Sequence, residues 1–394
     1  MLPVSDMAKR VKGQPMFQTL EKVQEYERQG KRIYHFEIGD PGFNTPRHIV
    51  DAACNSLRNG ETHYVSSVGI PDMINTIMEV TETSRGFKPR IGQVLVTPGA
   101  NIAIYLGISC LTNPTDEIII SNPCFPTYLS VAEMCQAKTV PITLSEENGF
   151  KFSPELINEA ITGKTRIIIL NSPNNPTGVV TPKKDIDEIY KIARDNGVYL
   201  MSDEVYARLV YGDTRFSTPS INDECSETCI VINGFSKAFA MTGWRIGTVI
   251  APSPVIKKMG LLVQTLCSCT PPFIQRAAIA AMRGNQEDVD AMISTYKMRR
   301  EYTLTELNSI PGISCYNSDG AFYVFPNISS TGMTSKEFTE FILDTAGVAV
   351  LPGTDFGSAG EGYIRMSYSG KSSEIKEGLR CMKQAMIKNA DEVV

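Results

Sequence analysis

Histidine is scarce in this chain, and its scarcity argues against most hydrolytic chemistry. The 394 residues include three histidines, His35, His48 and His63, and none lies in a motif for a nucleophile or a metal. Most hydrolytic triads and catalytic zinc sites need at least one well-placed imidazole. Proton transfer would then fall to a lysine, a tyrosine or a carboxylate. Lysine chemistry in turn indicates a cofactor that carries a carbonyl group.

Long apolar runs and an excess of basic charge are also missing. Charged side chains interrupt the N-terminal segment, and every apolar stretch is far shorter than the roughly 20 residues that span a bilayer. The formal charge is −5, with both signs interspersed, so the chain offers no positive field for nucleic acid. We therefore expect a cytoplasmic protein with no nucleic-acid partner and no membrane association.

The ten cysteines do not form a recognisable framework. They are scattered, often within apolar surroundings, which is typical of reduced core thiols rather than disulfides. The close pairs at 225 and 229 and at 267 and 269 have no second pair or nearby histidine that would complete a tetrahedral zinc site. We expect no metal.

Between about residues 90 and 250, short β-branched runs alternate with longer amphipathic segments. This alternation predicts an α/β fold with a mostly parallel sheet flanked by helices. Apolar strands of this kind are covered on both faces. The predicted strands are 94–97, 118–121, 167–171, 199–202, 230–233 and 248–250.

The alternation of strand and helix patterns ends at about residue 285, and the sequence after it predicts a smaller α+β unit. The first 45 residues are too few to form a core alone and are expected to pack with that unit. The predicted division is therefore a large α/β domain, 46–285, and a small domain made of 1–45 plus 286–394. The elements predicted in the C-terminal part are helices at 292–308 and 335–346 and strands near 348–351 and 363–367.

Five of the predicted strands run directly into loops rich in glycine, proline, asparagine, serine or charge. In a parallel sheet these loops share one edge, and ligands bind beyond the carboxyl ends of the strands. One polar loop would mean little, but five that carry aspartate, tyrosine, asparagine and lysine predict one shared crevice. The loops are 97–101, 121–126, 171–178, 202–206 and 233–237.

Two of these loops indicate particular chemistry. Gly99, Ala100 and Asn101 precede a helical segment, so their amides and the helix N-terminus could hold a phosphate. The glycine spacing of nucleotide-binding loops is absent, which favours a single phosphate. Lys237 follows an apolar strand, where desolvation would suit a Schiff-base amine, and Arg245 adds a fork of donors for phosphate.

At these residues the chain resembles the class I/II aminotransferases, the aspartate aminotransferase-like, fold-type-I enzymes that depend on pyridoxal 5′-phosphate. The resemblance begins with the run SKAFAMTGWRIG at 236–247, NSPNNPTG at 171–178 and SDEVY at 202–206. Further matches fall in the family's order and cover essentially the whole chain. They are IGDP at 38–41, THY at 62–64 and YIRMS at 363–367.

The resemblance implies roles for the residues of the crevice. Lys237 would form the internal aldimine and carry the proton between Cα and the cofactor, and Asp203 would keep the pyridine nitrogen protonated. Tyr206 and Asn175 would bind the phenolic oxygen of the cofactor. Phe125 would stack on its ring.

The resemblance also implies which residues bind the cofactor phosphate and the substrate. Arg365, assisted by Gly39 and Asn175, would bind the α-carboxylate of the substrate. Residues of the N-terminal segment could also line the pocket: Arg10, Lys12, Gln14, Phe17 and Gln18. The residues implied around the phosphate are Gly99, Ala100, Asn101, Ser236 and Arg245.

Tyr64 matches a tyrosine that in this family reaches the phosphate of the neighbouring subunit, which implies a homodimer. The chain also departs from the family pattern. Gly234 replaces a phosphate-binding serine found in many members, and Phe125 replaces the tryptophan that aspartate-type enzymes often carry. The helix after Asn101 has no lysine or arginine through Glu117, so a preference for dicarboxylates is in doubt.

The reaction implied is ping-pong transfer of an α-amino group between an L-amino acid and a 2-oxo acid, as part of amino-acid metabolism. An alternative keeps the cofactor and changes the reaction, because relatives also act as lyases, cyclases or oxidases. A catalytically silent fold is a third reading, which would require loss of the cofactor residues. Those residues are all present: Asn175, Asp203, Tyr206, Lys237, Arg245 and Arg365.

Overall fold

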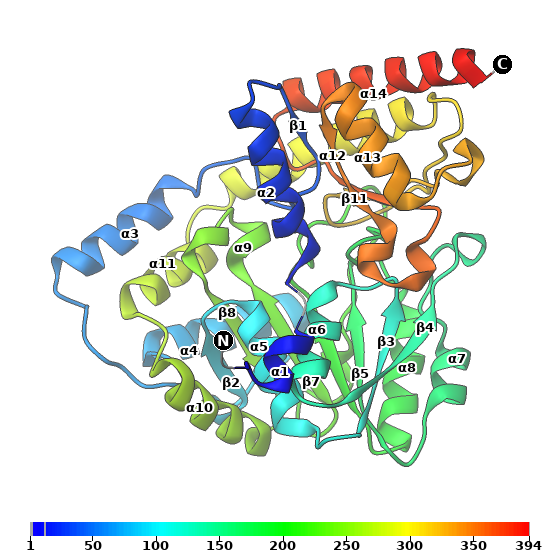
Figure 1. Ribbon diagram of the computed structural model, residues 1–394. Helices are drawn as coiled ribbons and strands as arrows, with labels where there is room; N and C mark the ends of the chain where they lie inside the picture. The colour runs from blue at the N-terminus through cyan, green and yellow to red at the C-terminus, as the bar shows by residue number, and fades with distance from the viewer. Residues whose placement is uncertain (1–2, 12, 394) are drawn as a thin grey trace.

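A twisted seven-stranded sheet forms the centre of the molecule (Figure 1). The structure is a computed structural model that describes residues 3–11 and 13–393, with side chains up to residue 390. Within these residues the strand order is β2-β8-β7-β6-β5-β3-β4. The strands are β2 (Val94–Thr97), β3 (Glu117–Asn122), β4 (Lys138–Thr143), β5 (Thr165–Asn171), β6 (Tyr199–Asp203), β7 (Cys229–Gly234) and β8 (Gly247–Ile250).

The sheet is mostly parallel, as the sequence pattern predicts. Strands β3 to β7 are parallel neighbours, whereas β8 runs antiparallel to both β7 and β2. The reversal follows from the connection, because residues 235–246 between β7 and β8 form only short helical turns and no crossover helix. The edge strand β4 was not predicted. It contains Pro141, and all but one of its residues are exposed or half-buried, which suits an edge position.

Helices cover both faces of the sheet, and each face has its own apolar core. Residues alternate along a strand: Ile118 and Ile120 pack with α5, α6 and α10, whereas Ile119 packs on the opposite face. That opposite face is covered mainly by α4, α8 and α11. The helices are α4 (Pro71–Arg85), α5 (Ala100–Leu111), α6 (Pro126–Met134), α7 (Pro154–Ala160), α8 (Lys183–Asp195), α10 (Ser253–Cys267) and α11 (Pro272–Arg283).

Both ends of the chain meet beyond this sheet. In Figure 1 the blue helix α2 and strand β1 lie beside the orange and red C-terminal helices. Strand β1 (Tyr34–His35) pairs in parallel with β10 (Val348–Ala349). A second small sheet has the order β11-β12-β9. Its strands are β9 (Tyr323–Val324), β11 (Leu351–Pro352) and β12 (Ile364–Ser367).

The remaining helices complete the fold. The division of the chain at residues 46 and 285 remains a prediction, although α12 begins at Glu287, close to the second boundary. None of the helices in the described part of the chain is long and apolar enough to cross a membrane. The helices α2 (Pro15–Arg28), α13 (Ser335–Ala346) and α14 (Ser372–Val393) contact the small sheets, and α12 (Glu287–Leu307) packs on α14. Helix α3 (Arg47–Arg58) packs on α11 instead, and α1 (Asp6–Arg10) contacts α6.

Candidate active site

The carboxyl ends of β2, β3, β5, β6 and β7 reach the same edge of the sheet, and a cavity of about 550 Å³ lies there. This is the shared crevice predicted from the polar loops. Most of the predicted site residues line the cavity: Gly39, Ala100, Asn101, Phe125, Asn175, Asp203, Tyr206, Ser236, Lys237 and Arg245.

Lys237 lies in the short helix α9 (Phe235–Ala238), which begins directly after β7. Its side chain is half-buried, and Nζ donates a hydrogen bond of 2.6 Å to the carbonyl oxygen of Gly39. The N-terminal segment therefore reaches the amine from outside the main sheet. Sequence spacing could not show this contact, because it joins positions 198 residues apart.

Asp203 is the last residue of β6 and is fully buried. Tyr128 Oη donates a hydrogen bond of 2.6 Å to Asp203 Oδ2, and the Val205 amide donates one of 3.3 Å to Oδ1. Burial raises the pKa of the Asp203 carboxyl to about 6, although these two donors oppose the shift. A cationic partner would therefore stabilise this carboxylate strongly.

The N-terminus of α5 and Arg245 form the basic corner of the cavity. Gly99, the residue before the helix, has φ 90°, a conformation that favours glycine. A Cβ at this position would lie 2.7 Å from Arg245 Nη2, so the guanidinium packs directly on the glycine. Gly99 itself does not line the cavity, whereas Ala100, Asn101 and Arg245 do. The free amides of a helix start and a guanidinium together suit a phosphate.

Arg365 lies on β12, behind the cavity wall, and is fully buried. Its Nη2 donates to the carbonyl oxygen of Glu37, but Nε and Nη1 have no partner among the described residues. Burial lowers the pKa of its guanidinium. The side-chain oxygen of Asn175 is also buried without a partner. Unpaired buried groups of this kind are costly unless a ligand satisfies them.

Tyr323, on β9, separates Arg365 from the cavity. The Arg365 guanidinium lies 4.6 Å from the centre of the Tyr323 ring, and Tyr323 Oη is 2.9 Å from Tyr206 Oη. A Cβ on Gly39 would lie 1.8 Å from Tyr323 Oη, so any larger residue there would displace the Tyr323 ring. The substrate carboxylate would therefore meet Tyr206, Tyr323 and Gly39 on its way to Arg365.

The sequence reasoning missed Tyr128 and Tyr323. Tyr128 had a usable signal, because it follows Phe125 by three residues at the start of a helix and so shares its face. Tyr323 had none, since its neighbours come from distant segments. Among the suggested N-terminal residues, Gln14 and Phe17 line the cavity, whereas Arg10 and Gln18 do not and Lys12 is outside the described residues.

Tyr64 does not line the cavity either. Its side chain is 87% exposed on the loop between α3 and α4. A single chain therefore gives it no role in its own site, and its predicted role in a neighbouring subunit stays a prediction.

The residues present fit pyridoxal 5′-phosphate. The cavity combines an amine, a buried carboxylate of raised pKa and a basic corner at a helix N-terminus. Behind its wall, the buried Arg365 has N–H groups without a partner among the described residues. These features correspond to the aldehyde, the pyridine nitrogen and the phosphate of the cofactor, and to the carboxylate of a substrate.

The chain belongs to the family of class I and II aminotransferases, whose model matches residues 31–381. It is 39% identical to an aspartate aminotransferase of Pyrococcus horikoshii over 382 residues, which cover 96% of this chain and 95% of the relative. It is 38% identical to an aromatic-amino-acid aminotransferase of Thermococcus litoralis over 359 residues, 90% of this chain and 92% of the relative.

Solved structures agree with this assignment. An aspartate aminotransferase variant of Thermus thermophilus complexed with tryptophan superposes with a TM-score of 0.93 at 31% identity, covering 98% of this chain and all of the other. An alanine aminotransferase of Pyrococcus furiosus also superposes with a TM-score of 0.93, at 30% identity, and covers 98% of this chain and all of the other. The protein is therefore an aminotransferase that depends on pyridoxal 5′-phosphate, with an amino acid and an oxo acid as its substrates.

Proposed function

We propose that this cavity transfers an α-amino group between an L-amino acid and a 2-oxo acid in two half-reactions, with Lys237 as the residue that moves the proton. The observation that carries the proposal is the placement of the Lys237 amine and the Asp203 carboxylate, from neighbouring strand ends, in one cavity. When bound, pyridoxal phosphate supplies an electron sink for the charge that develops at the substrate Cα.

Asp203 would hold the proton on the pyridine nitrogen of the cofactor. Among the described residues, the hydrogen-bonding partners of its buried carboxylate are Tyr128 and the Val205 amide, and neither is a cation. A protonated ring nitrogen would supply that cation and return the Asp203 pKa toward its ordinary value. Tyr128 would fix the orientation of the carboxylate.

The basic corner would bind the cofactor phosphate. Arg245 Nη1 donates to the carbonyl oxygen of Thr242 at 2.9 Å, which fixes the guanidinium against Gly99. Ala100, Asn101 and Ser236 line the same cavity as Arg245, and their N–H and hydroxyl groups would complete the phosphate site. Phe125 would pack on the ring, and Tyr206 and Asn175 would bind its phenolic oxygen.

Arg365 would bind the α-carboxylate of the substrate, because its Nε and Nη1 have no other partner among the described residues. A charge-assisted pair of this kind is strong because both partners are charged and water is excluded. Gly39 and Asn175 would complete the carboxylate site. The Lys237 amine donates to the Gly39 carbonyl, so binding of the cofactor to that amine would release the carbonyl at the carboxylate site.

The amino donor is proposed to have an uncharged side chain. Among the described residues, the cations that line the cavity are Lys237 and Arg245, and both are assigned to the cofactor. Much of the remaining wall is apolar or neutral, with Gln14, Phe17 and Ile104. Asp40 adds an acidic side chain to it. A second carboxylate on the donor would therefore find no unassigned cation among the described residues of this chain.

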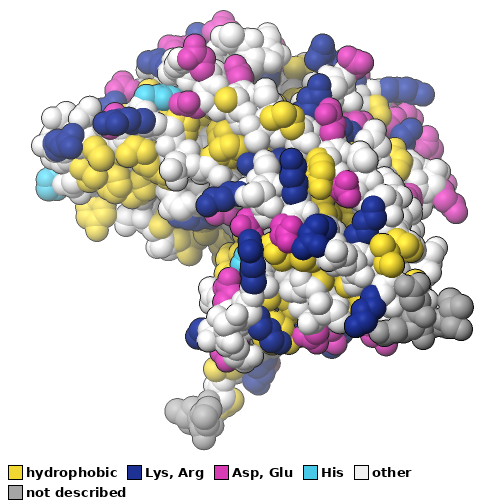
Figure 2. All heavy atoms as spheres, turned by 90° about the horizontal axis from the view of Figure 1, so that it is seen from above, with side chains coloured by type: hydrophobic (Ala, Val, Ile, Leu, Met, Phe, Trp, Pro, Cys, Tyr) yellow, Lys and Arg dark blue, Asp and Glu magenta, His cyan; other side chains and the backbone are white. Residues whose placement is uncertain are grey.

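Assembly and location are proposed together with this function. Tyr64 and Leu57 are exposed on or next to α3, and Figure 2 shows hydrophobic side chains gathered on the side of the molecule where Figure 1 places α3. We propose a homodimer in which this side is covered and Tyr64 completes the partner's phosphate site. All ten cysteines are free thiols, which supports a reducing, cytoplasmic location.

A screen of the twenty amino acids against the holoenzyme tests the proposed reaction. Without an oxo acid, a true donor should convert the bound cofactor to its amine form, seen as loss of the long-wavelength absorption band. Adding a 2-oxo acid should restore the band and yield a new amino acid. Release of ammonia and an oxo acid without any acceptor would instead indicate a lyase.

A further inference from the structure

A second cavity, of about 570 Å³, lies on the opposite side of the strand ends from the active site. It is enclosed by α4, α9, the end of α11 and residues 216–221. Its walls are largely apolar and aromatic, and its volume falls within the roughly 300–1,000 Å³ typical of small-molecule pockets. The apolar wall includes Ile77, Val80, Phe216, Val231, Phe235 and Phe239.

A single layer of chain separates the two cavities. Along α9, Ser236 and Lys237 face the active site, whereas Phe235 and Ala238 face the second cavity. Successive residues at the end of β6 also line different cavities. Asp203 lines the active site, and the next residue, Glu204, lines the second cavity. A ligand in the second cavity would therefore contact the elements that position the catalytic lysine and the aspartate.

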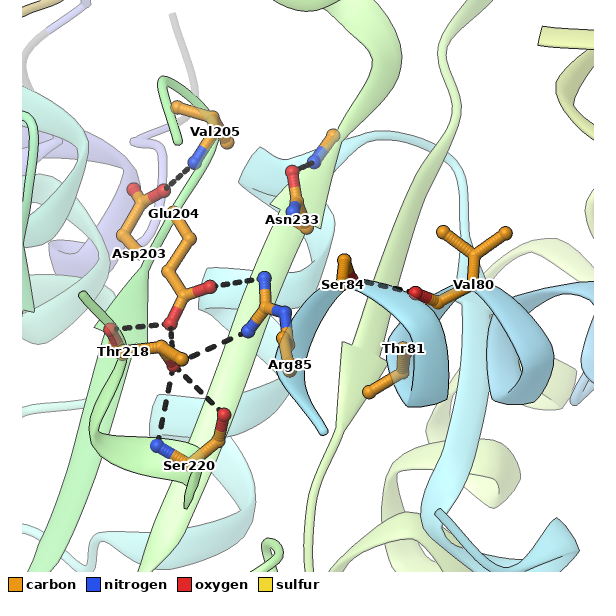
Figure 3. A network of polar contacts seen from close by, with 12 residues as sticks. Val80, Thr81, Ser84, Arg85, Asp203, Glu204, Val205, Thr218, Ser220 and Asn233 are labelled. Carbon is orange, nitrogen blue, oxygen red and sulfur yellow. Dashed lines mark hydrogen bonds and ion pairs between the residues drawn. The ribbon is translucent and has the colours of Figure 1, made fainter. Parts of the chain in front are cut away.

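The deep polar groups of the second cavity satisfy one another (Figure 3). Glu204 is fully buried and forms an ion pair with Arg85 at the end of α4. Its other oxygen accepts hydrogen bonds from Thr218 at 2.5 Å and Ser202 at 3.1 Å. A buried pair that is neutral overall has little affinity for a further charge.

One charged side chain of the lining, Arg208, is left without an opposite charge, and it lies at the rim of the cavity. The ionisable residues that line this cavity, among those described, are Arg85, Glu204 and Arg208. Arg208 has no carboxylate within ion-pair distance in the described chain. Its Nη1 donates to Gln286 Oε1 at 2.7 Å, and its guanidinium lies 5.1 Å from the centre of the Phe239 ring. Both neighbours line the cavity, so they hold the guanidinium at its mouth.

We propose that the second cavity binds a small amphipathic carboxylic acid, with its carboxylate on Arg208 and its aromatic or branched apolar body between Phe235 and α4. The net charge of the lining is positive by one, which matches one carboxylate. The apolar walls match the body of such an acid better than a sugar or a polyphosphate. This site is independent of the roles proposed above for the active site.

The test uses the holoenzyme and 3-[4-(trifluoromethyl)phenyl]propanoate, observed by fluorine NMR. The probe also fits the active site, because Arg365 would bind its carboxylate. We therefore expect two bound resonances in the wild type. Arg365→Met should remove one of them, and Arg208→Gln should weaken the other at least tenfold, the loss expected for a charge-assisted hydrogen bond. Arg283→Gln, an exposed arginine outside the lining, should change neither.

A second pair of variants guards against misfolding. Val80→Trp should fill the cavity from α4 and remove the Arg208-dependent resonance, whereas Thr83→Trp, exposed on the same helix and outside the lining, should retain it. A single bound resonance that disappears with Arg365→Met would overturn the proposal. So would a second resonance that is unaffected by Arg208→Gln and Val80→Trp. Failure of the Arg365 assignment would leave the Arg208-dependent resonance in place.

Discussion

At the scale of one residue, the buried Asp203 carboxylate lowers the stability of the apoprotein while it provides a partner for the cofactor. Its pKa is raised from 3.8 to about 6 by burial. Between these two values the folded apoprotein holds the proton and the unfolded chain has released it. The contribution of Asp203 to stability is therefore present at low pH and is lost as the pH rises through about 6. Bound cofactor would compensate for this loss.

We predict that Asp203→Asn stabilises the apoprotein at pH 7.5 by about 1–3 kcal/mol, because a buried charge is replaced by a neutral amide. The gain should be much smaller at pH 4.5, where the wild-type carboxyl is protonated. Urea denaturation of both apoproteins at the two pH values measures this difference. Asp213→Asn, an exposed residue, is the control. An equal effect at both pH values would contradict the assigned pKa shift.

Arg365 gives a second prediction at this scale. Arg365→Met should lower kcat/KM for the amino donor about 10- to 100-fold or more, because two charge-assisted hydrogen bonds are lost. The free energy of unfolding should change little, since the substitution also removes a buried charge that lacks a carboxylate partner. Steady-state kinetics and urea denaturation of one preparation measure both. A loss of stability without a loss of activity would show a purely structural role.

The sequence could identify the residues that carry chemistry but not most of their partners. Lys237 and Asp203 stand in recognisable runs after apolar strands. The contacts of Lys237 with Gly39, and of Tyr206 with Tyr323, join segments far apart in the chain. Such contacts depend on how the chain ends fold back over the sheet, which local patterns do not encode.

At the scale of elements, the start of α5 depends on one glycine. Gly99→Ala would force a Cβ toward Arg245 in a conformation that favours glycine. We predict about 1–3 kcal/mol of lost stability and weaker binding of the cofactor. Gly163→Ala, where a Cβ meets nothing within 4 Å and φ is not left-handed, is the control. Release of the cofactor, measured by absorbance, should be greater from Gly99→Ala than from Gly163→Ala. If both variants retained the cofactor equally well, the assignment of the phosphate site to the start of α5 would be refuted.

The elements most open to sequence prediction were those with strong local signals. Helix α13 was predicted with the observed bounds. Thr334 and Glu337 form a reciprocal capping box at its start, a local arrangement that favours a helix there. The edge strand β4 was missed because a short, half-exposed strand with a proline has no such signal. The antiparallel direction of β8 depends on tertiary pairing and could not be read from its composition.

At the scale of the whole molecule, the two chain ends close over the sheet edge where the cavity lies. The pairing of β1 with β10 brings Gly39 toward Lys237, and β12 brings Arg365 to the same place. The net charge of −5 says little about the ligands, because the arginines that would bind them are local features. Arrangement, rather than composition, decides what this protein binds.

The proposed homodimer makes a prediction about mixed subunits. If Tyr64 completes the partner's site, a heterodimer of Lys237→Ala and Tyr64→Ala chains has one site with both defects and one intact site. Its activity should approach half that of the wild type. If Tyr64 acts within its own chain, both sites are defective and the heterodimer stays at the level of its parents. Activity of purified, differently tagged heterodimers measures the outcome.

The central claim is that Lys237 moves the proton in the cavity at the sheet edge. The most direct test is a single-turnover measurement of cofactor absorbance after mixing the holoenzyme with an identified donor in the absence of an oxo acid. Lys237→Ala, reconstituted with the same cofactor, should slow this turnover by about 10²–10⁴-fold, the usual contribution of a positioned proton-transfer group. A turnover rate equal to that of the wild type would contradict the account.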